Sequence, residues 1–212
     1  MSTAETIFAA IIAAVSAWGL VLTSHVLEGL DKFRWQMFRF YTSLSNAAVF
    51  LTHLLLLFPG PVREALRSAR GRYITVLCIL VTFLVYFFVL TPCGRISDKT
   101  LKALGVRRLS NLIVHYLTPG LTALEWLCVA EKDGLGLSDA LAWLAVPLCY
   151  LLLCVWRAAA GVRIGATGML WPYGFMDLEA LGMARWIKNL LWTLAGFLAL
   201  GLGLLGAARL LT

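Results

Sequence analysis

A threonine and a histidine in two different apolar segments are the side chains of this sequence best suited to chemistry. Thr42 lies about seven residues into segment 35–58, and His115 lies about six residues into segment 109–129. A threonine hydroxyl is a weak nucleophile until a neighbouring base takes its proton. Histidine suits that task because its pKa lies near neutrality and because it can later protonate a leaving alcohol. Together the two side chains could cleave an ester, with Thr42 as nucleophile and His115 as general base and acid.

Polar residues follow one face of each of these two segments. In segment 109–129 they recur every three or four positions, and in segment 35–58 they are spaced by three, four and seven, which fits one face of a helix. A polar group inside a membrane is costly, so two such faces are expected to turn inward toward a shared cavity. The polar residues are Asn111, His115, Thr118, Thr122 and Glu125 in the later segment, and Arg39, Thr42, Asn46 and His53 in the earlier one.

The threonine and the histidine are also expected at the same depth. At 1.5 Å per residue both lie roughly 10 Å below one membrane face, because the two segments run in the same direction. His25 and Glu28 end the first apolar segment on that side, and the aromatic segment 171–177 opens there as well. This convergence predicts a cavity open to one face, at a depth where the carbonyl of a lipid ester would lie.

Three amide or carboxylate side chains are candidate partners of the pair. Asn46 and Asn111 lie one helical turn from the threonine and the histidine, and they are candidate amide donors to a developing oxyanion. Asp177 is the candidate group that orients the imidazole, provided that its segment folds inward. A plainer reading stays open. Asparagines commonly join membrane helices, and a membrane threonine commonly bonds the backbone carbonyl four residues back.

Further polar residues on the same side are candidate contacts for a substrate. His25 is a rival base or a contact for a substrate carboxylate. Arg39 could pair with an acyl carboxylate or with a lipid headgroup. Tyr173, in the aromatic segment 171–177, is a further candidate for substrate binding.

Structural roles are expected for other polar residues and for a proline. Pro119 should kink its helix and free the carbonyl of His115, because proline cannot donate a backbone hydrogen bond. His53 should snorkel or cap a helix end, and Glu125 should pair with a hydroxyl. Segment 62–72 is expected to be a basic connector between two spans.

The elements that must position these residues are membrane-spanning helices. Of the 212 residues, 61% are hydrophobic and 14% are charged, with a mean hydropathy of +0.86. Soluble domains are about 45–50% apolar and about 25% charged, and a membrane helix needs about 20 apolar residues. We expect an all-α polytopic membrane protein, a single domain over residues 1–212, with six transmembrane helices around the polar cavity. The expected helices cover 7–27, 35–58, 73–90, 109–129, 141–156 and 185–211.

Several other classes of protein are not expected. The first apolar run has no Lys or Arg ahead of it and is too long for a signal peptide, so it predicts a retained first helix. The five cysteines lack the spacing of metal or redox sites, and the sequence has no phosphate loop, zinc-protease motif or serine elbow. The net charge of +7 lies mainly in short connectors that meet lipid headgroups. We therefore expect membrane lipids rather than nucleic acid as partners, and no cofactor or metal.

Three short motifs carry a family resemblance. In order and spacing they resemble signatures of a bacterial six-span membrane family related to the eukaryotic androgen-induced and androgen-dependent membrane proteins. The motifs are residues 40–46 (FYTSLSN), 114–119 (VHYLTP) and 171–177 (WPYGFMD). The eukaryotic relatives are threonine hydrolases that cleave fatty acid esters of hydroxy fatty acids, and their essential threonine and histidine correspond to Thr42 and His115. The resemblance implies a multi-pass hydrolase of the bacterial inner membrane, active in lipid metabolism; the third motif belongs to the bacterial branch.

Three other functions remain open on the sequence alone. A transporter or proton-coupled carrier could use the same polar cavity, although the two halves show no repeat of the kind that many carriers have. His25 and His115 could ligate haem or a metal, although no spacing motif supports ligation. A non-catalytic scaffold is the third. An ester hydrolase is the leading hypothesis because the threonine and the histidine converge.

Overall fold

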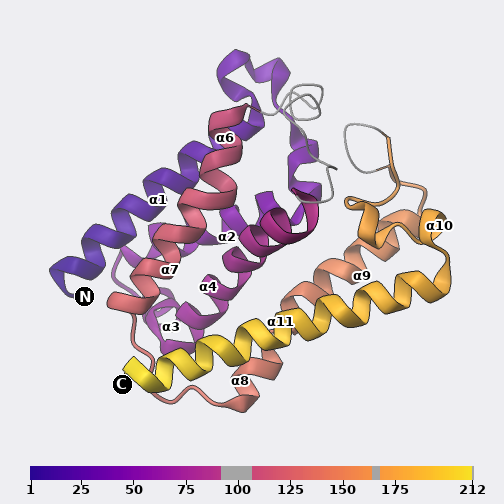
Figure 1. Cartoon of the computed structure of the whole chain (residues 1–212). Helices are drawn as coiled ribbons and strands as arrows, with labels where there is room; N and C mark the ends of the chain where they lie inside the picture. The colour runs from indigo at the N-terminus through magenta and orange to yellow at the C-terminus, as the bar shows by residue number, and fades with distance from the viewer. Residues whose placement is uncertain (92–106, 164–167, 212) are drawn as a thin grey trace. The chain divides into compact units, whose positions relative to one another are not determined.

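The regular secondary structure of the described part of the chain is all helical. The computed structural model describes residues 1–91, 107–163 and 168–211, and within these ranges there is no β-strand. The residues cluster into two compact units, Met1–Gly134 and Leu135–Leu211 (Figure 1). The predicted all-α class is confirmed, and one domain over the whole chain stays a prediction.

Four helical segments within the described ranges are long and apolar enough to cross a membrane, which supports the prediction of a membrane protein. They are α1 (Thr3–Ser24), α4 (Ala69–Leu84) with the π-helix η4 (Val85–Leu90), α8 (Leu137–Ala142) with α9 (Ala145–Ala159), and α11 (Met183–Leu211). The other two predicted spans differ from single long helices. One is a 3-10 turn, η3 (Trp35–Arg39), followed by the 16-residue α2 (Tyr41–Leu56), and the other joins α6 (Arg108–Leu112), the π-helix η5 (Ile113–Leu117) and α7 (Thr118–Cys128).

Unit 1 packs α1, α2, α4 and α7 around a small apolar core. α1 begins with a capping box in which Glu5 N–H donates to Ser2 Oγ at 3.2 Å and Ser2 N–H donates to Glu5 Oε2 at 2.6 Å. Further along α1, Gly19 allows close approach to η5, because an added Cβ would lie 2.8 Å from Ile113 Cγ2. One cluster of this core joins a residue each from α1, α2 and α4, all without exposed surface; they are Ile12, Val49 and Ile79. Both α1 and α2 also contact η5, the turn that carries His115.

The helix around His115 widens by one residue immediately before Pro119. Thr118 N–H donates to the carbonyl of Ile113, five residues back instead of four. In this register the next pair would join Pro119 to Val114, and proline has no N–H to donate. The α-helical count predicted a freed carbonyl at His115, and this is corrected: in the widened turn the proline faces Val114.

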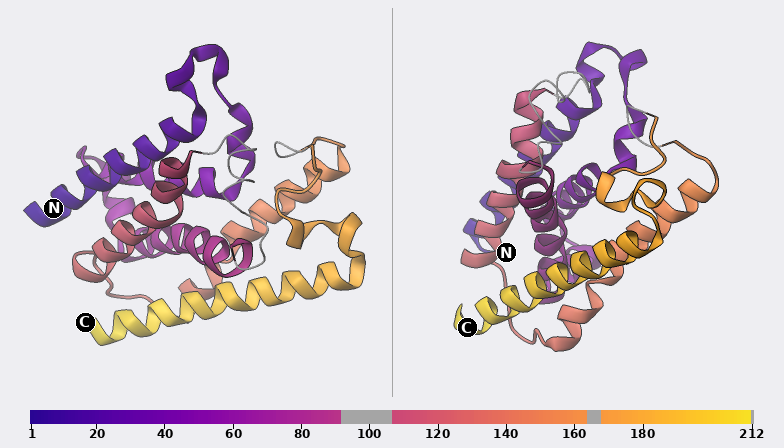
Figure 2. Two further views of the ribbon diagram at one scale, coloured as in Figure 1. Left: turned by 45° about the horizontal axis from the view of Figure 1, so that its top comes forward. Right: turned by 45° about the vertical axis from the view of Figure 1, so that its right-hand side comes forward.

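Unit 2 folds its aromatic segment against its longest helix. A 3-10 turn and one short helix precede the 29-residue α11 (Figure 2); they are η6 (Gly174–Met176) and α10 (Leu178–Leu181). Trp186 Nε1–H donates to the Met176 carbonyl at 2.8 Å, and Asn189 Nδ2–H donates to the Phe175 carbonyl at 3.1 Å. The segment 171–177 is thereby fixed on a helix of its own unit.

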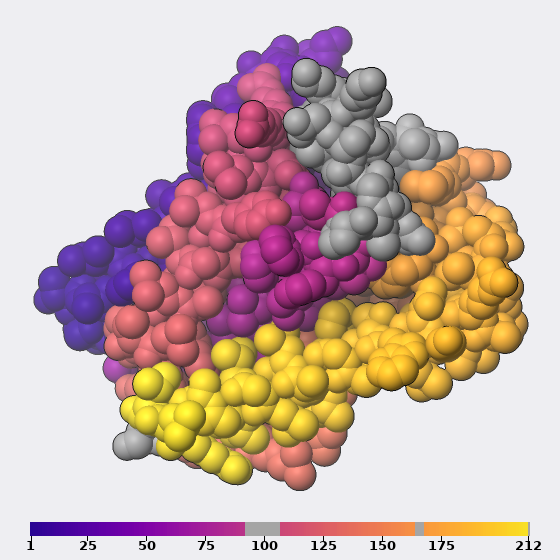
Figure 3. Space-filling view, viewed as in Figure 1, coloured from indigo at the N-terminus to yellow at the C-terminus, as the bar shows by residue number. Residues whose placement is uncertain are grey.

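The sequence of α11, which is drawn in yellow in Figure 3, is largely apolar along its length. Leu191 is 62% exposed and Trp192 is 71% exposed. Large apolar side chains facing outward on a helix of this length are typical of a lipid-facing span.

Candidate functional site

The first turn of α2 brings a threonine hydroxyl against the imidazole of η5. Thr42 Oγ1 lies 3.3 Å from His115 Nε2, and both residues are half-buried. Thr42 is the second residue of α2, so the residue four positions earlier precedes the helix and its carbonyl is not in helical register. Threonines deeper in other helices do bond that carbonyl, at 2.7–2.8 Å; these are Thr23, Thr75, Thr122 and Thr193. The start of α2 therefore leaves the Thr42 hydroxyl to point across to His115.

The surroundings of His115 define which ring nitrogen carries the proton. Nδ1 lies 3.2 Å from the backbone carbonyl of Asn111. A carbonyl can only accept, so the neutral imidazole carries its hydrogen on Nδ1. Nε2 is then the acceptor that faces the Thr42 hydroxyl, which is the arrangement a general base requires.

Asn46 ties α2 to the widened turn. Its Nδ2 donates to the carbonyl of Thr42 at 2.8 Å and to the carbonyl of Val114 at 3.1 Å. The second bond satisfies the carbonyl that Pro119 leaves without a partner in its own helix. Because both amide hydrogens are used on backbone carbonyls, Asn46 does not serve here as the expected oxyanion donor. It holds the two helices in register.

Asn111 contacts the site through two groups. Its carbonyl faces His115 Nδ1, and its Nδ2 donates to Tyr86 Oη at 2.6 Å. The Tyr86 ring lies parallel to the His115 ring, with 4.0 Å between centroids and 26° between planes. Sequence reasoning missed Tyr86. The available signal was a tyrosine among apolar residues of a span, because a buried tyrosine hydroxyl needs a partner.

The predicted contacts His25 and Arg39 lie in the turns that connect α1 to α2. His25 ends α1 with a left-handed backbone, φ +60°, and its Nδ1 lies 3.0 Å from Glu28 Oε1. Arg107 Nη2 lies 2.5 Å from the same oxygen. The Arg107 guanidinium, followed by His25, holds the pKa of the Glu28 carboxyl below its usual range. His25 thus belongs to an ionic group with Glu28, and Arg39 is the half-buried last residue of η3.

Asp177 and Tyr173 belong to unit 2, whereas Thr42 and His115 belong to unit 1. Asp177 Oδ1 accepts the N–H of Ala180 at 3.1 Å and so caps α10. Tyr173 stacks on Phe175, with ring centroids 5.5 Å apart and 10° between planes. Their expected roles toward His115 and a substrate stay predictions.

The polar residues at the opposite end of α2, α4 and α7 form an ion-pair cluster. Arg72 Nη2 lies 2.7 Å from Glu125 Oε1, and His53 Nε2 lies 3.8 Å from Glu125 Oε2. All three are at most 2% exposed. The expectation for Glu125 is wrong, because it pairs with a guanidinium rather than a hydroxyl. His53 is buried and does not snorkel; it lies in the last turn of α2, with Nδ1 2.8 Å from the Val49 carbonyl. Arg72, assigned to the basic connector 62–72, is part of the interior, where its charge is balanced by Glu125.

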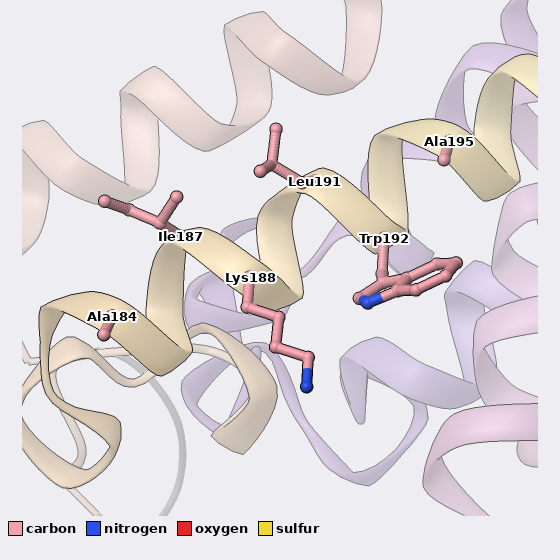
Figure 4. Close-up of a pocket in the computed structure, with 6 residues that line it drawn as sticks. All are labelled: Ala184, Ile187, Lys188, Leu191, Trp192 and Ala195. Carbon is pink, nitrogen blue, oxygen red and sulfur yellow. The ribbon is translucent and has the colours of Figure 1, made fainter.

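A shallow apolar pocket lies along α11 in unit 2 (Figure 4). Among the described residues, its charged lining group is Lys188, beside Trp192. The described lining residues offer no hydroxyl, imidazole or carboxylate that could act as a nucleophile or base. The Thr42–His115 pair is therefore the better candidate for chemistry.

No group of three or more His, Cys, Asp or Glu side chains is arranged to hold a metal ion within residues 1–91, 107–163 and 168–211. No protein-family model, curated protein or solved structure matches the chain.

Proposed function

We propose that this protein is an intramembrane hydrolase of lipid-like carboxylic esters, such as fatty acid esters of hydroxy fatty acids. Thr42 is the nucleophile, and His115 is the general base and acid. The observation that carries the proposal is the 3.3 Å contact between Thr42 Oγ1 and His115 Nε2. The nitrogen at that contact is the one left unprotonated by the Asn111 carbonyl, so it can accept the hydroxyl proton.

The proposal includes six crossings of a bacterial inner membrane around a polar cavity. Beside the four long apolar segments, α2 and the joined helices α6, η5 and α7 supply the remaining two. Both carry polar residues along one face, and a polar face is stable in a membrane only where it meets other polar groups. The contact between Thr42 and His115 supports the inward orientation of both faces.

The first half of the reaction transfers the acyl group to the enzyme. The Thr42 hydroxyl gives its proton to His115 Nε2 while Oγ1 bonds to the ester carbonyl carbon, and the carbonyl oxygen becomes an oxyanion. The oxyanion then re-forms the carbonyl, and the bond to the alcohol oxygen breaks. The leaving oxygen takes the proton from Nε2 and departs as the alcohol.

The second half releases the acid. A water molecule gives a proton to His115 Nε2 and attacks the acyl-Thr42 carbonyl. The bond between the acyl carbon and Thr42 Oγ1 breaks, and Oγ1 recovers the proton. The fatty acid leaves, and the Nδ1 bond to the Asn111 carbonyl keeps the same ring nitrogen in use throughout.

Hydrolysis of a long-chain fatty acid ester in mixed micelles tests the proposal. Thr42→Ala should abolish turnover, and Thr42→Ser should retain part of it because a hydroxyl remains. Thr75→Ala is the matched control, since the Thr75 hydroxyl is used on the Gly71 carbonyl at 2.8 Å. Equal turnover by wild type and Thr42→Ala, with both proteins folded, would contradict the proposal.

A further inference from the structure

The imidazole of His115 is restrained by two groups that do not take part in proton transfer. One is the Asn111 carbonyl at Nδ1, and the other is the aromatic ring of Tyr86, stacked 4.0 Å from the imidazole. We infer that Tyr86 is a positioning residue that holds the His115 ring with Nε2 toward Thr42. The expected effect of Tyr86 on catalysis rests on the proposed function, whereas its expected effect on the orientation of the His115 ring rests on the geometry alone.

Tyr86 can restrain the imidazole because its own hydroxyl and ring are both held by neighbouring side chains. Its hydroxyl accepts the hydrogen bond of Asn111 Nδ2 at 2.6 Å, and its ring is 6% exposed. The ring of Tyr116 packs against it edge to face, with centroids 5.7 Å apart. Asn111 therefore anchors both partners, the imidazole through its carbonyl and the tyrosine through its amide. To move away from the imidazole, Tyr86 would have to break its hydrogen bond with Asn111, the residue whose carbonyl also bonds His115.

The backbone at Tyr86 is fixed by a widened turn like the one at His115. In η4 the Tyr86 carbonyl accepts the N–H of Thr91 at 3.0 Å and the Thr91 hydroxyl at 2.8 Å. Single π-turns inside helices are frequent at functional sites. Here Tyr86 and His115 each lie in such a turn, and their rings stack on each other.

A restrained ring matters because the imidazole has to face one oxygen after another. Nε2 takes a proton from Thr42 and then returns it to a leaving oxygen. An imidazole that rotated about its side-chain bond would present a carbon edge to one of them. A misplacement of about 1 Å in such a site lowers the rate about 100-fold.

Two matched variants separate the ring of Tyr86 from its hydroxyl. Tyr86→Leu removes the stack, and Tyr86→Phe keeps the stack while losing the bond from Asn111. Phe88→Leu is the control, because Phe88 lies in the same π-helix and is 64% exposed. We expect Tyr86→Leu to lower kcat about 10- to 100-fold with little change in KM. Tyr86→Phe should rescue most of that loss and remain about three-fold below wild type, and Phe88→Leu should match wild type.

A second measurement reports on the ring without any need for turnover. In protein labelled with ¹⁵N-histidine, the His115 signals, assigned by their loss in His115→Ala, should show a protonated Nδ1 and an unprotonated Nε2. Tyr86→Leu should shift them toward a mixture of the two tautomers, and Phe88→Leu should leave them unchanged. Unchanged His115 signals in folded Tyr86→Leu would overturn the inference. Shifted signals in a protein that hydrolyses no ester would support the positioning of His115 and count against the proposed function instead.

Discussion

The two ends of α2, α4 and α7 bury polar side chains in opposite ways. At one end Arg72 and Glu125 form a 2.7 Å ion pair with at most 2% of each side chain exposed. At the other end Thr42 and His115 are uncharged, half-buried partners in a 3.3 Å contact. Charges that are sealed from every ligand and neutralise each other hold helices together. Groups that are neutral at rest, poised for proton transfer and partly accessible are suited to chemistry.

The comparison also shows where each end places its irregular backbone. The ion-pair end lies on ordinary α-helical turns near the end of α2 and the start of α4. The neutral end carries both π-turns, η4 and η5, and the proline. Asn46 bonds the Val114 carbonyl that Pro119 leaves without a helical partner, and the Thr91 hydroxyl adds a second bond to the Tyr86 carbonyl. The helices are therefore irregular around the Thr42–His115 pair and regular around the Arg72–Glu125 pair.

The largest expected effect separates activity from stability at the neutral end. His115→Ala should lower ester hydrolysis about 10²- to 10⁴-fold, the usual contribution of a general acid and base. Its thermal unfolding in detergent should stay close to that of wild type, because the side chain is half-buried and bonded to one carbonyl and one hydroxyl. Full turnover by His115→Ala together with a much lower unfolding temperature would reverse the roles assigned to the two ends.

At the ion-pair end the effect should fall on stability. Glu125→Leu leaves the buried Arg72 charge without a partner, which costs about 3–5 kcal/mol. Adding Arg72→Met removes that charge, so the double variant should recover most of the loss, because a buried pair replaced by apolar side chains is commonly neutral. Denaturant or thermal unfolding of the single and double variants measures this. If the double variant is less stable than Glu125→Leu, Arg72 stabilises the fold through contacts other than its ion pair with Glu125.

The repaired turn predicts a smaller and coupled effect. Asn46→Ala leaves the Val114 carbonyl unsatisfied, at a cost of about 1–3 kcal/mol. Pro119→Ala supplies a backbone N–H that can bond this carbonyl, so the loss should be smaller in the double variant than in Asn46→Ala alone. The coupling energy from a double-mutant cycle of unfolding measures this. Strict additivity of the two changes would show that the amide and the proline do not share the carbonyl.

The smallest expected effect is a pH-dependent one at the surface. Arg107 and His25 hold the pKa of Glu28 below its ordinary value of 4.5. A lowered pKa in the folded state contributes stability that is fully present above the ordinary value and is lost as the pH falls through the lowered one. The unfolding temperature of Glu28→Gln should therefore lie slightly below that of wild type at neutral pH, and the two should converge in acid. A difference that grows in acid would contradict this assignment.

The sequence predicted the helical class and the membrane character through its composition and the length of its apolar segments, and the meeting of Thr42 with His115 through the spacing of its polar residues. Polar residues spaced by three, four and seven must share a face, and equal distances from the ends of co-directional helices place two side chains at one height. The two side chains meet although neither stretch is a regular α-helix, since a 3-10 turn precedes Thr42 and a π-turn carries His115.

Counting failed where the backbone departs from 3.6 residues per turn or where a contact joins distant segments. Because of the π-turn, the carbonyl left without a helical N–H by Pro119 is that of Val114 and not that of His115. No local sequence pattern predicts such a turn. The stack of Tyr86 on His115 joins residues of two helices, as does the pairing of Arg72 with Glu125. Each of these contacts depends on how helices rotate about their axes, and that rotation is set by packing of the whole bundle.

The most direct measurement is the site of covalent labelling by a fluorophosphonate or an activated lipid ester, read by mass spectrometry of the digested wild-type protein. The account predicts a single adduct on Thr42, formed faster than in His115→Ala and absent in Thr42→Ala. An adduct on another residue, or undiminished labelling of folded Thr42→Ala, would contradict the assignment of Thr42 as nucleophile.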